Sequence, residues 1–349
     1  MLPADHRPFI DKYFLRAKEI LEKDNLNPIV KAQVFIRRGA VNVYGLREAI
    51  DIIKKYSDCN TLEIHALKDG DKFDGGECLM TIKAPIQSII DLETMYLGVL
   101  SAETTLRNGE RDINLNSIKE NMSKIVELAE GRPVSYFGAR HWRYDRDAEI
   151  SKACFEAGAE NCSTDAGAAG IGQEGIGTIP HALEAIYHWR NGLENAVFVA
   201  THAFEENIDE SVPRIALVDY ANMEILDSLS VAPFVNAIRI DTCGENKMQG
   251  EMQTRGVTIG GVYAIRKVLN DSGYGNVDII LSSGFGDPNK VKAFTDAEKM
   301  LGIRLFDGLG VGGVFVSRAA TMDIIEVEGQ EIHKVGRLPK DTSRLKRII

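Results

Sequence analysis

The sequence predicts an α/β protein: an irregular TIM-like βα barrel of about seven strands, with an N-terminal α+β domain that also takes the C-terminal hairpin. Three observations support this prediction. The first 108 residues mix helix-like and strand-like patterns, residues 131–320 repeat the order strand, loop, helix, and the tail after Met322 reads as a two-stranded hairpin. We therefore expect one domain from residues 1–112 plus 322–349, and a barrel-like domain from residues 113–321.

The expected elements of the first domain alternate in type along the chain. Apolar residues at helical spacing predict helices, and short runs bounded by glycine predict strands. The expected elements are a helix over Asp11–Lys23, a strand over Ala32–Arg37, a helix over Gly45–Tyr56, two short strands within Leu67–Ile82 and a helix over Asp91–Leu106.

Seven short, mostly apolar runs in the second region predict parallel strands covered on both faces. They are Pro133–Tyr136, Glu160–Ser163, Ala196–Ala200, Arg214–Val218, Asn236–Ile240, Val277–Leu281 and Ile303–Phe306. Helical patterns such as Asp145–Ala157, Thr258–Leu269 and Pro288–Leu301 lie between most of them. Repeated βα units build either an open doubly wound sheet or a closed barrel, and we favour the barrel.

Composition narrows the classes of function. The 349 residues carry a net charge of −10, which disfavours nucleic acid and anionic membranes as partners. The N-terminus has no secretion-signal pattern, and no apolar run is long enough to cross a membrane. Five scattered cysteines without C-x-x-C spacing predict reduced thiols and no zinc site. We therefore expect a cytoplasmic protein that acts on small molecules.

Polar and glycine-rich segments follow the predicted strands. Each is an ordinary loop or helix-cap sequence when taken alone. In βα barrels, however, the active site is built from several strand ends at one face, so their repetition predicts a site there. The segments are Phe137-Gly-Ala-Arg140, Ser163-Thr-Asp165, Asp219, Arg239-Ile-Asp241, Ser283-Gly-Phe-Gly-Asp287 and Asp307-Gly-Leu-Gly-Val-Gly-Gly313.

The last two of these segments favour phosphate binding. Each is expected to follow a strand and to precede a helix. Glycine lets backbone N–H groups approach an anion closely, and a helix N-terminus adds a favourable dipole. Phosphate sites in barrels often use the final two βα loops, so the pair predicts a phosphate site.

These motifs, in this order from Asp11 to Arg337, resemble the nicotinate, nicotinamide and quinolinate phosphoribosyltransferases, called type II, and most of all the nicotinate enzymes. The resemblance implies transfer of a ribose phosphate from phosphoribosyl pyrophosphate to a pyridine base in NAD biosynthesis or salvage. Phe137-Gly-Ala-Arg140 resembles the segment that stacks on the pyridine and meets its substituent. Gly177-Thr-Ile-Pro-His181 resembles the segment with the active-site histidine. Arg239-Ile-Asp241 resembles the pair at the ribose and pyrophosphate.

The resemblance extends to further residues. Ser283, Gly284, Gly310, Gly312 and Gly313 fall in segments that resemble the two 5′-phosphate loops. Asp11-Lys-Tyr13 resembles a segment that reaches into the neighbouring subunit's site, and Arg38 resembles a phosphate-contacting arginine supplied in the same way. A homodimer or higher homo-oligomer with shared active sites is thus implied. Cys243-Gly-Glu-Asn-Lys247 departs from the pattern, because it lacks the basic residues often found after the Arg-x-Asp pair.

The residue types suit this chemistry. Displacement of pyrophosphate at the ribose C1 passes through a cation-like sugar, which nearby carboxylates stabilise. Asp219 and Asp241 are candidate ligands of Mg²⁺ bridging ribose and pyrophosphate. Arg140 and Arg239 offer planar donors for carboxylate and phosphate. Phe137 and Tyr13 are candidates to sandwich a flat ring.

Catalytic roles are predicted for His181, Arg239 and Asp241, with Ser163 and Asp165 among the substrate-binding candidates. In some relatives the histidine matching His181 is transiently phosphorylated by ATP, so ATP is a possible further substrate. A lone histidine at a helix start is also often structural or simply exposed.

Alternative functions differ in what they require. Nicotinate needs one cationic partner and quinolinate needs two, so Arg140 as the single strong candidate favours nicotinate. An ionised Asp165 beside the ring would instead suit nicotinamide. We therefore expect Asp165 to turn away and cap the following glycine-rich turn.

A Schiff-base aldolase would need a lysine at a strand end. A non-catalytic nucleotide-binding relative would not need the set Arg140, His181, Arg239 and Asp241.

Overall fold

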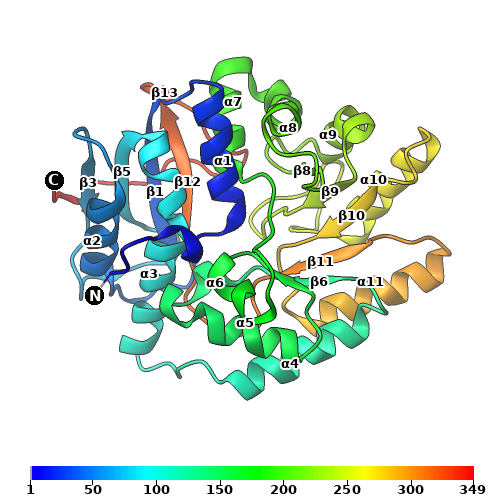
Figure 1. Ribbon diagram of the computed structural model, residues 1–349, viewed down its shortest axis with the longest axis horizontal. Coiled ribbons are helices and arrows are strands. Elements are labelled where there is room, and N and C mark those ends of the chain that lie inside the picture. Colours follow the sequence, from blue (N-terminus) through cyan, green and yellow to red (C-terminus); the bar gives the residue numbers. More distant parts are fainter. Residues whose placement is uncertain (1) are drawn as a thin grey trace.

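The computed structural model describes residues 2–349 and contains two main β-sheets, which lie side by side in Figure 1. One is antiparallel, with the strand order β13-β12-β1-β5-β3-β14. Its strands are β1 (Ile29–Ile36), β3 (Glu63–Ala66), β5 (Cys78–Pro85), β12 (Ala320–Val327), β13 (Gln330–Glu331) and β14 (Lys346–Arg347). A separate antiparallel pair joins β2 (Val41–Asn42) to β4 (Lys72–Phe73).

The C-terminal segment completes the antiparallel sheet, as the sequence predicts. Strand β12 pairs with β1 from Val30 opposite Val327 to Ile36 opposite Ala320, and β13 turns back against β12 as a hairpin. Strand β14 closes the far edge beside β3. Both chain ends therefore lie next to this sheet (Figure 1).

Helices α1 (Lys12–Lys23), α2 (Leu46–Tyr56) and α3 (Glu93–Arg107) accompany the antiparallel sheet, and all three were expected. Helix α3 is apolar over most of its circumference and is buried over most of its length, as a helix between two layers must be. Helix α4 (Leu115–Leu128) then carries the chain to the second sheet. No helix among residues 2–349 is long and apolar enough to cross a membrane.

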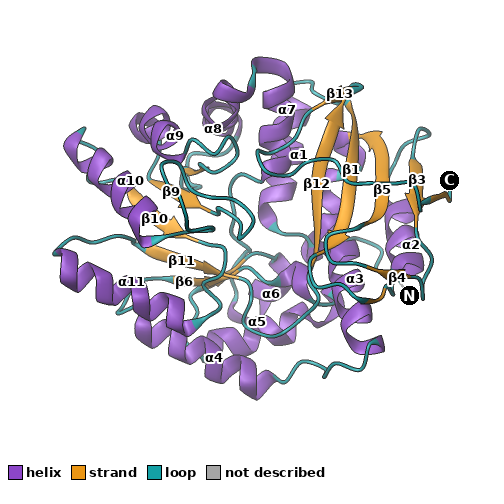
Figure 2. Cartoon of the chain, turned by 180° about the vertical axis from the view of Figure 1, so that it is seen from behind, coloured by secondary structure: helices purple, strands orange, loops and turns teal. Residues whose placement is uncertain are grey.

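The second sheet is parallel and has six strands in the order β7-β6-β11-β10-β9-β8. They are β6 (Val134–Tyr136), β7 (Asn161–Cys162), β8 (Ile215–Leu217), β9 (Ala237–Ile240), β10 (Asp278–Leu281) and β11 (Gly308–Val311). Its helices include α4, α10 and α11, which lie outside the strands in Figure 2. The helices that follow α4 are α5 (Asp147–Glu156), α6 (Asp165–Ala168), α7 (His181–Asn191), α8 (Ala196–Asn207), α9 (Glu224–Val231), α10 (Ile259–Asp271) and α11 (Pro288–Leu301).

The parallel sheet corrects the predicted closed barrel of about seven strands. It has six strands and stays open, because β7 and β8 form its two edges. The expected strand Ala196–Ala200 is the first part of helix α8. This run is apolar throughout, and a short apolar run fits a buried helix as well as a buried strand.

The last strand lies later in the chain than predicted. Residues 303–306 do not form a strand, and β11 begins at Gly308 inside the segment that was expected to be a loop. Asp307 consequently lies at the start of β11, where it pairs with Arg266 and with Arg304. The segment after β11 leads to β12 and not to a helix, so only the first of the two glycine-rich loops precedes a helix.

The two layers meet where α3 packs on the short helix η4 (Ala139–His141). A Cβ atom on Gly98 would lie 2.2 Å from the carbonyl oxygen of Trp142, directly after η4. The helix and the following turn can approach this closely only because position 98 has no side chain. Gly98 therefore fixes the position of η4.

We predict that Gly98→Ala lowers the free energy of unfolding by about 1–3 kcal/mol, because the new methyl group meets backbone that cannot rotate away. Gly260→Ala is the matched control. It is also helical, but there a Cβ would meet only the end of a side chain, the carboxylate of Glu251, and no backbone. Urea unfolding of both variants makes the comparison, and equal stability of the two would contradict the packing argument.

Candidate active site

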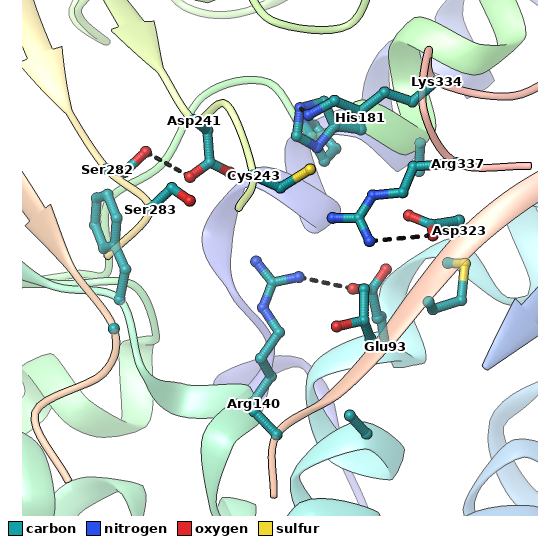
Figure 3. Close-up of a pocket in the computed structure, with 18 of the residues that line it drawn as sticks. Glu93, Arg140, His181, Asp241, Cys243, Ser282, Ser283, Asp323, Lys334 and Arg337 are labelled. Atoms are coloured by element: carbon teal, nitrogen blue, oxygen red, sulfur yellow. Dashed lines mark hydrogen bonds and ion pairs between the residues drawn. The ribbon is translucent and has the colours of Figure 1, made fainter. Parts of the chain in front are cut away.

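A cavity of about 630 Å³ lies between the carboxyl ends of the parallel strands and the antiparallel sheet. Phe137, Arg239 and Asp241 line it from the parallel side, and Arg37, Asp323 and Lys334 line it from the other side. Figure 3 shows the charged side chains of both sides facing one another across the space. The two sheets therefore build one site together.

Two glycine-rich turns form one end of the cavity. Ser283 and Gly284, after β10, have φ values of 66° and 88°, and α11 begins at Pro288 shortly after them. Gly312 and Gly313 follow β11, and Gly286 packs against Gly313 so closely that a Cβ would lie 2.2 Å from its carbonyl oxygen. The two turns thus touch, and both line the cavity or its margin.

Lys290 of α11 adds a cation behind the first turn. Its Nζ donates to the carbonyl oxygen of Ser283 at 3.0 Å, and burial lowers the pKa of Lys290 to about 8. Free N–H groups, a helix N-terminus and a nearby ammonium together favour an anion.

Arg239 and Asp241 stand at the end of β9, next to these turns. The Arg239 guanidinium donates to the Ser282 hydroxyl at 3.3 Å and to the carbonyl of Ile179 at 3.2 Å. The Ser282 hydroxyl in turn donates to Asp241 Oδ1 at 2.8 Å, as Figure 3 shows. Asp241 Oδ2 lies 3.5 Å from Arg239 and is the less restrained oxygen.

His181, Asp219 and Lys334 form a buried charged group on another wall. His181 Nε2 lies 2.9 Å from Asp219 Oδ1 and 2.9 Å from Lys334 Nζ, and Lys334 also pairs directly with Asp219 Oδ2. Burial would raise the pKa of Asp219, but Lys334 and His181 hold it well below its usual range. Burial, together with the Lys334 ammonium, lowers the pKa of His181. The imidazole is therefore neutral near pH 7.

Arg140 lines the same cavity as the glycine turns. It donates to Glu93 at 2.8 Å and to the Tyr13 hydroxyl, and lies 3.9 Å from Asp11. Burial raises the pKa of Glu93 to about 7, although Arg140 opposes the rise. Phe137 lines the same cavity and packs against Gly310, where a Cβ would come within 2.6 Å of the ring. A cation beside the Tyr13 ring, in a cavity that Phe137 also lines, suits a flat ligand with an acidic substituent.

Tyr13 lies in the cavity of its own chain, where it contacts Arg140. Its reach into a neighbouring subunit's site stays a prediction. Arg38, in contrast, lies outside the cavity, with about half of its side chain exposed and with Glu110 at 3.5 Å. A role for Arg38 in a neighbouring subunit stays a prediction.

Three further candidates do not line the cavity. Asp11 is buried, and its carboxylate accepts from the hydroxyl groups of Tyr13 and Thr94. Ser163 is buried behind the site. Asp165 pairs with Lys12 at 3.0 Å and accepts from the backbone N–H of Gly175 at 2.8 Å. Asp165 thus accepts from the glycine-rich segment that follows it and does not line the cavity, and its orientation relative to a bound base stays a prediction.

Sequence reasoning missed the charged residues that the antiparallel sheet contributes. Arg37 pairs with Glu245, and Arg337 lies 3.8 Å from Asp323 and 3.7 Å from Glu245. These residues and Lys334 come from strand ends and from the tail after β13. The tail segment His333-Lys-Val-Gly-Arg337 contains two cationic residues. Its sequence does not indicate that the tail folds back against the cavity, and only that fold brings the two residues into the site.

The carboxylates do not form a preassembled metal site. Among residues 2–349, no group of three or more His, Cys, Asp or Glu side chains is arranged to hold a metal ion. Both oxygens of Asp219 are occupied by His181 and Lys334, so the predicted Mg²⁺ role of Asp219 does not fit the structure. Asp241 retains one accessible oxygen, which suits an ion held mainly by substrate phosphates.

Comparison with known proteins gives one family match and several similar folds. Residues 11–103 match the family model of the quinolinate phosphoribosyl transferase N-terminal domain. A Saccharomyces cerevisiae protein assigned as a nicotinate phosphoribosyltransferase is 13% identical with a TM-score of 0.72, over 99% of this chain and 97% of that chain.

Two bacterial nicotinate phosphoribosyltransferases have similar folds. The Vibrio cholerae structure is 13% identical with a TM-score of 0.68, over 94% of this chain and 87% of that chain. The Porphyromonas gingivalis structure is 14% identical with a TM-score of 0.66, over 97% of this chain and 95% of that chain. At these identities the likeness is one of fold.

We predict that Lys334→Met lowers the free energy of unfolding by about 3–5 kcal/mol at pH 8, because Asp219 is left buried without its cation. In the wild type the lowered pKa keeps Asp219 charged, so the pair stabilises the fold from pH 8 down to well below the usual carboxyl pKa. In the variant, burial raises the pKa of Asp219, so the loss shrinks as the pH falls and the carboxylate binds a proton.

Urea unfolding at pH 8 and pH 5 tests this prediction. Lys299→Met removes the exposed ion pair with Glu130 and should cost less than about 1 kcal/mol. A Lys334→Met loss that grows as the pH falls would show that Asp219 is not the group left unpaired.

Proposed function

We propose that this chain is a type II phosphoribosyltransferase that acts on nicotinate, a proposal supported by the family match over residues 11–103 and by the shared fold. It would join nicotinate to the ribose of phosphoribosyl pyrophosphate and release pyrophosphate. The observation that carries the proposal is the single cavity that the glycine turns, Arg239 with Asp241, and Arg140 with Tyr13 line together. These three groups suit the phosphate, the ribose and the base of the product.

Each part of the cavity has a task in this reaction. The glycine turns bind the 5′-phosphate through backbone N–H groups. Phe137 and Tyr13 hold the pyridine ring, and Arg140 pairs with its carboxylate. The ring nitrogen then attacks the ribose C1 as the bond to pyrophosphate breaks. Asp241 stabilises the positive charge that develops on the sugar.

The departing pyrophosphate needs cations that the segment after Asp241 does not supply. The opposite side of the cavity is lined by three cations, Lys334, Arg337 and Arg37. These side chains bind the departing pyrophosphate. A Mg²⁺ ion bound through phosphate oxygens and Asp241 would neutralise further charge on the leaving group. Coupling to ATP through His181 stays a prediction.

The base end of the cavity favours one acidic substituent. Arg140 is its strong cation, and Glu93 and Asp11 already stand beside it. A second carboxylate about 4 Å from an ionised neighbour would be repelled by about 4 kcal/mol at an effective dielectric of about 20. Quinolinate, with two carboxylates, therefore fits less well than nicotinate. Nicotinamide leaves the guanidinium without an anionic partner.

We expect nicotinate to be used in preference to nicotinamide and quinolinate when the three bases are compared side by side with phosphoribosyl pyrophosphate. Asp165→Asn should leave the preference unchanged, because Asp165 faces Lys12 and Gly175. Pyrophosphate exchange into phosphoribosyl pyrophosphate, dependent on the base, identifies turnover even when net product is small. Exchange with none of the three bases would mean that the chain is a non-catalytic relative.

We also expect Arg239→Ala and Asp241→Asn each to lower kcat/KM by at least about 10²-fold, or roughly 2.7 kcal/mol of transition-state stabilisation. Circular dichroism and the melting temperature should change little. Arg304→Ala, which removes an exposed arginine outside the cavity, is the control. A variant that stays within about twofold of the wild type would remove that residue from the mechanism.

A further inference from the structure

His141 lines the cavity but has no task in the reaction described above. It is the last residue of η4 and directly follows Arg140. Its Nδ1 lies 3.0 Å from the carbonyl oxygen of Gly312, in the turn after β11. A carbonyl oxygen only accepts hydrogen bonds, so Nδ1 carries the proton and Nε2 is the bare nitrogen.

The Gly312 carbonyl is fixed from three sides. It accepts from His141 and from the backbone N–H of Val314 at 3.1 Å, and Gly138 lies so close that a Cβ there would be 2.6 Å from the same oxygen. Gly312 must also lack a side chain, because a Cβ on it would lie 2.9 Å from Cε1 of His141. The orientation of this one peptide group is therefore set by its neighbours.

Because a peptide group is planar, a fixed Gly312 carbonyl also fixes the direction of the Gly313 N–H. No cis peptide bond occurs among the described residues, and in a trans peptide the C=O and the following N–H point in opposite directions. The N–H of Gly313 consequently points away from His141. Gly313 is exposed to the cavity, and within residues 2–349 its N–H donates to no protein acceptor.

The opposite turn presents donors to the same space. Within the described chain, the N–H groups of Ser283, Gly284, Phe285 and Gly286 also donate to no backbone carbonyl. Gly286 is in contact with Gly313, so the two sets of donors are adjacent. An anion held between the turns would receive hydrogen bonds from both, but only while the Gly312–Gly313 peptide keeps its orientation.

We propose that His141 is a positioning residue for the phosphate monoester of the substrate: it holds the Gly312 carbonyl back so that the Gly313 N–H faces the phosphate. This inference rests on the proposed function, because it takes the glycine turns to be the 5′-phosphate site. His141 acts as a neutral donor and not as a charge. Burial and the adjacent Arg140 lower the pKa of His141 to about 4, so its contribution should be constant between pH 6 and pH 8.

Three substitutions separate this role from a general packing role. Asn places a side-chain N–H near the position of Nδ1, Gln places it near that of Nε2, and Ala has none. Titration calorimetry with ribose 5-phosphate measures phosphate binding without a base, metal or turnover. We expect His141→Ala and His141→Gln to weaken binding by about tenfold or more, because each loses a charge-assisted hydrogen bond to the phosphate. The affinity of His141→Asn should stay within about threefold of that of the wild type.

Kinetics give a second readout. In His141→Ala the KM for phosphoribosyl pyrophosphate should rise about tenfold, while the KM for the base stays unchanged. A rise in the KM for the base would show that the substitution acts through Arg140, which would overturn the proposal. His202→Ala, at an exposed site on α8, is the control for loss of an imidazole.

The outcomes distinguish the two levels of inference. If the wild type binds ribose 5-phosphate and the Ala, Asn and Gln variants bind it equally well, the positioning role is wrong and the phosphate site stands. If the wild type does not bind ribose 5-phosphate, the proposed function fails and the role of His141 fails with it. Should His141→Ala fold poorly, the contrast between Asn and Gln still decides the question.

Discussion

Lys334 and Asp219 join two sheets that have no strand in common. Asp219 follows β8 of the parallel sheet, and Lys334 follows β13 of the antiparallel sheet. Both side chains are almost fully buried, so each needs the other, because an isolated buried charge costs several kcal/mol. This pair sets how the C-terminal tail lies over the parallel strands. The tail in turn brings Arg337 to the cavity and gives His181 a fixed polar neighbour.

Close approach of backbone to backbone is the second constraint on the site. Gly98 lets α3 meet the turn after η4, and Gly286 lets the turn after β10 meet the turn after β11. Both contacts border one cavity, which Arg140 and the glycine turns line together. The separation between Arg140 and the glycine turns is therefore set by backbone packing, which is stiffer than any arrangement of long side chains.

Much of this arrangement could be predicted from local sequence. The helices over residues 12–23 and 288–301, the turn at Ser283-Gly284 and the pair Arg239-Asp241 follow from periodicity, glycine placement and strand ends. The prediction of a strand over Ala196–Ala200 is wrong, because an apolar run of that length suits a helix as well as a strand. Residues Gly308–Val311 resemble a loop in composition, yet they form a central strand, since glycine there admits the ring of Phe137. The partnership of Asp219 with Lys334 depends on tertiary contact and leaves no local signal.

The pairing of β12 with β1 also governs the order in which the protein can fold during synthesis. Val30 is made before the parallel layer and its partner Val327 after it, so the antiparallel sheet lacks one of its central strands while the ribosome builds that layer. Until then β1 has one open edge, which other nascent chains can pair with. The closing of this long loop is slow because distant segments must meet, so folding of the antiparallel sheet ends only after the whole parallel layer has been made. The cavity is completed at the same moment, which means that no partly made chain carries a finished site.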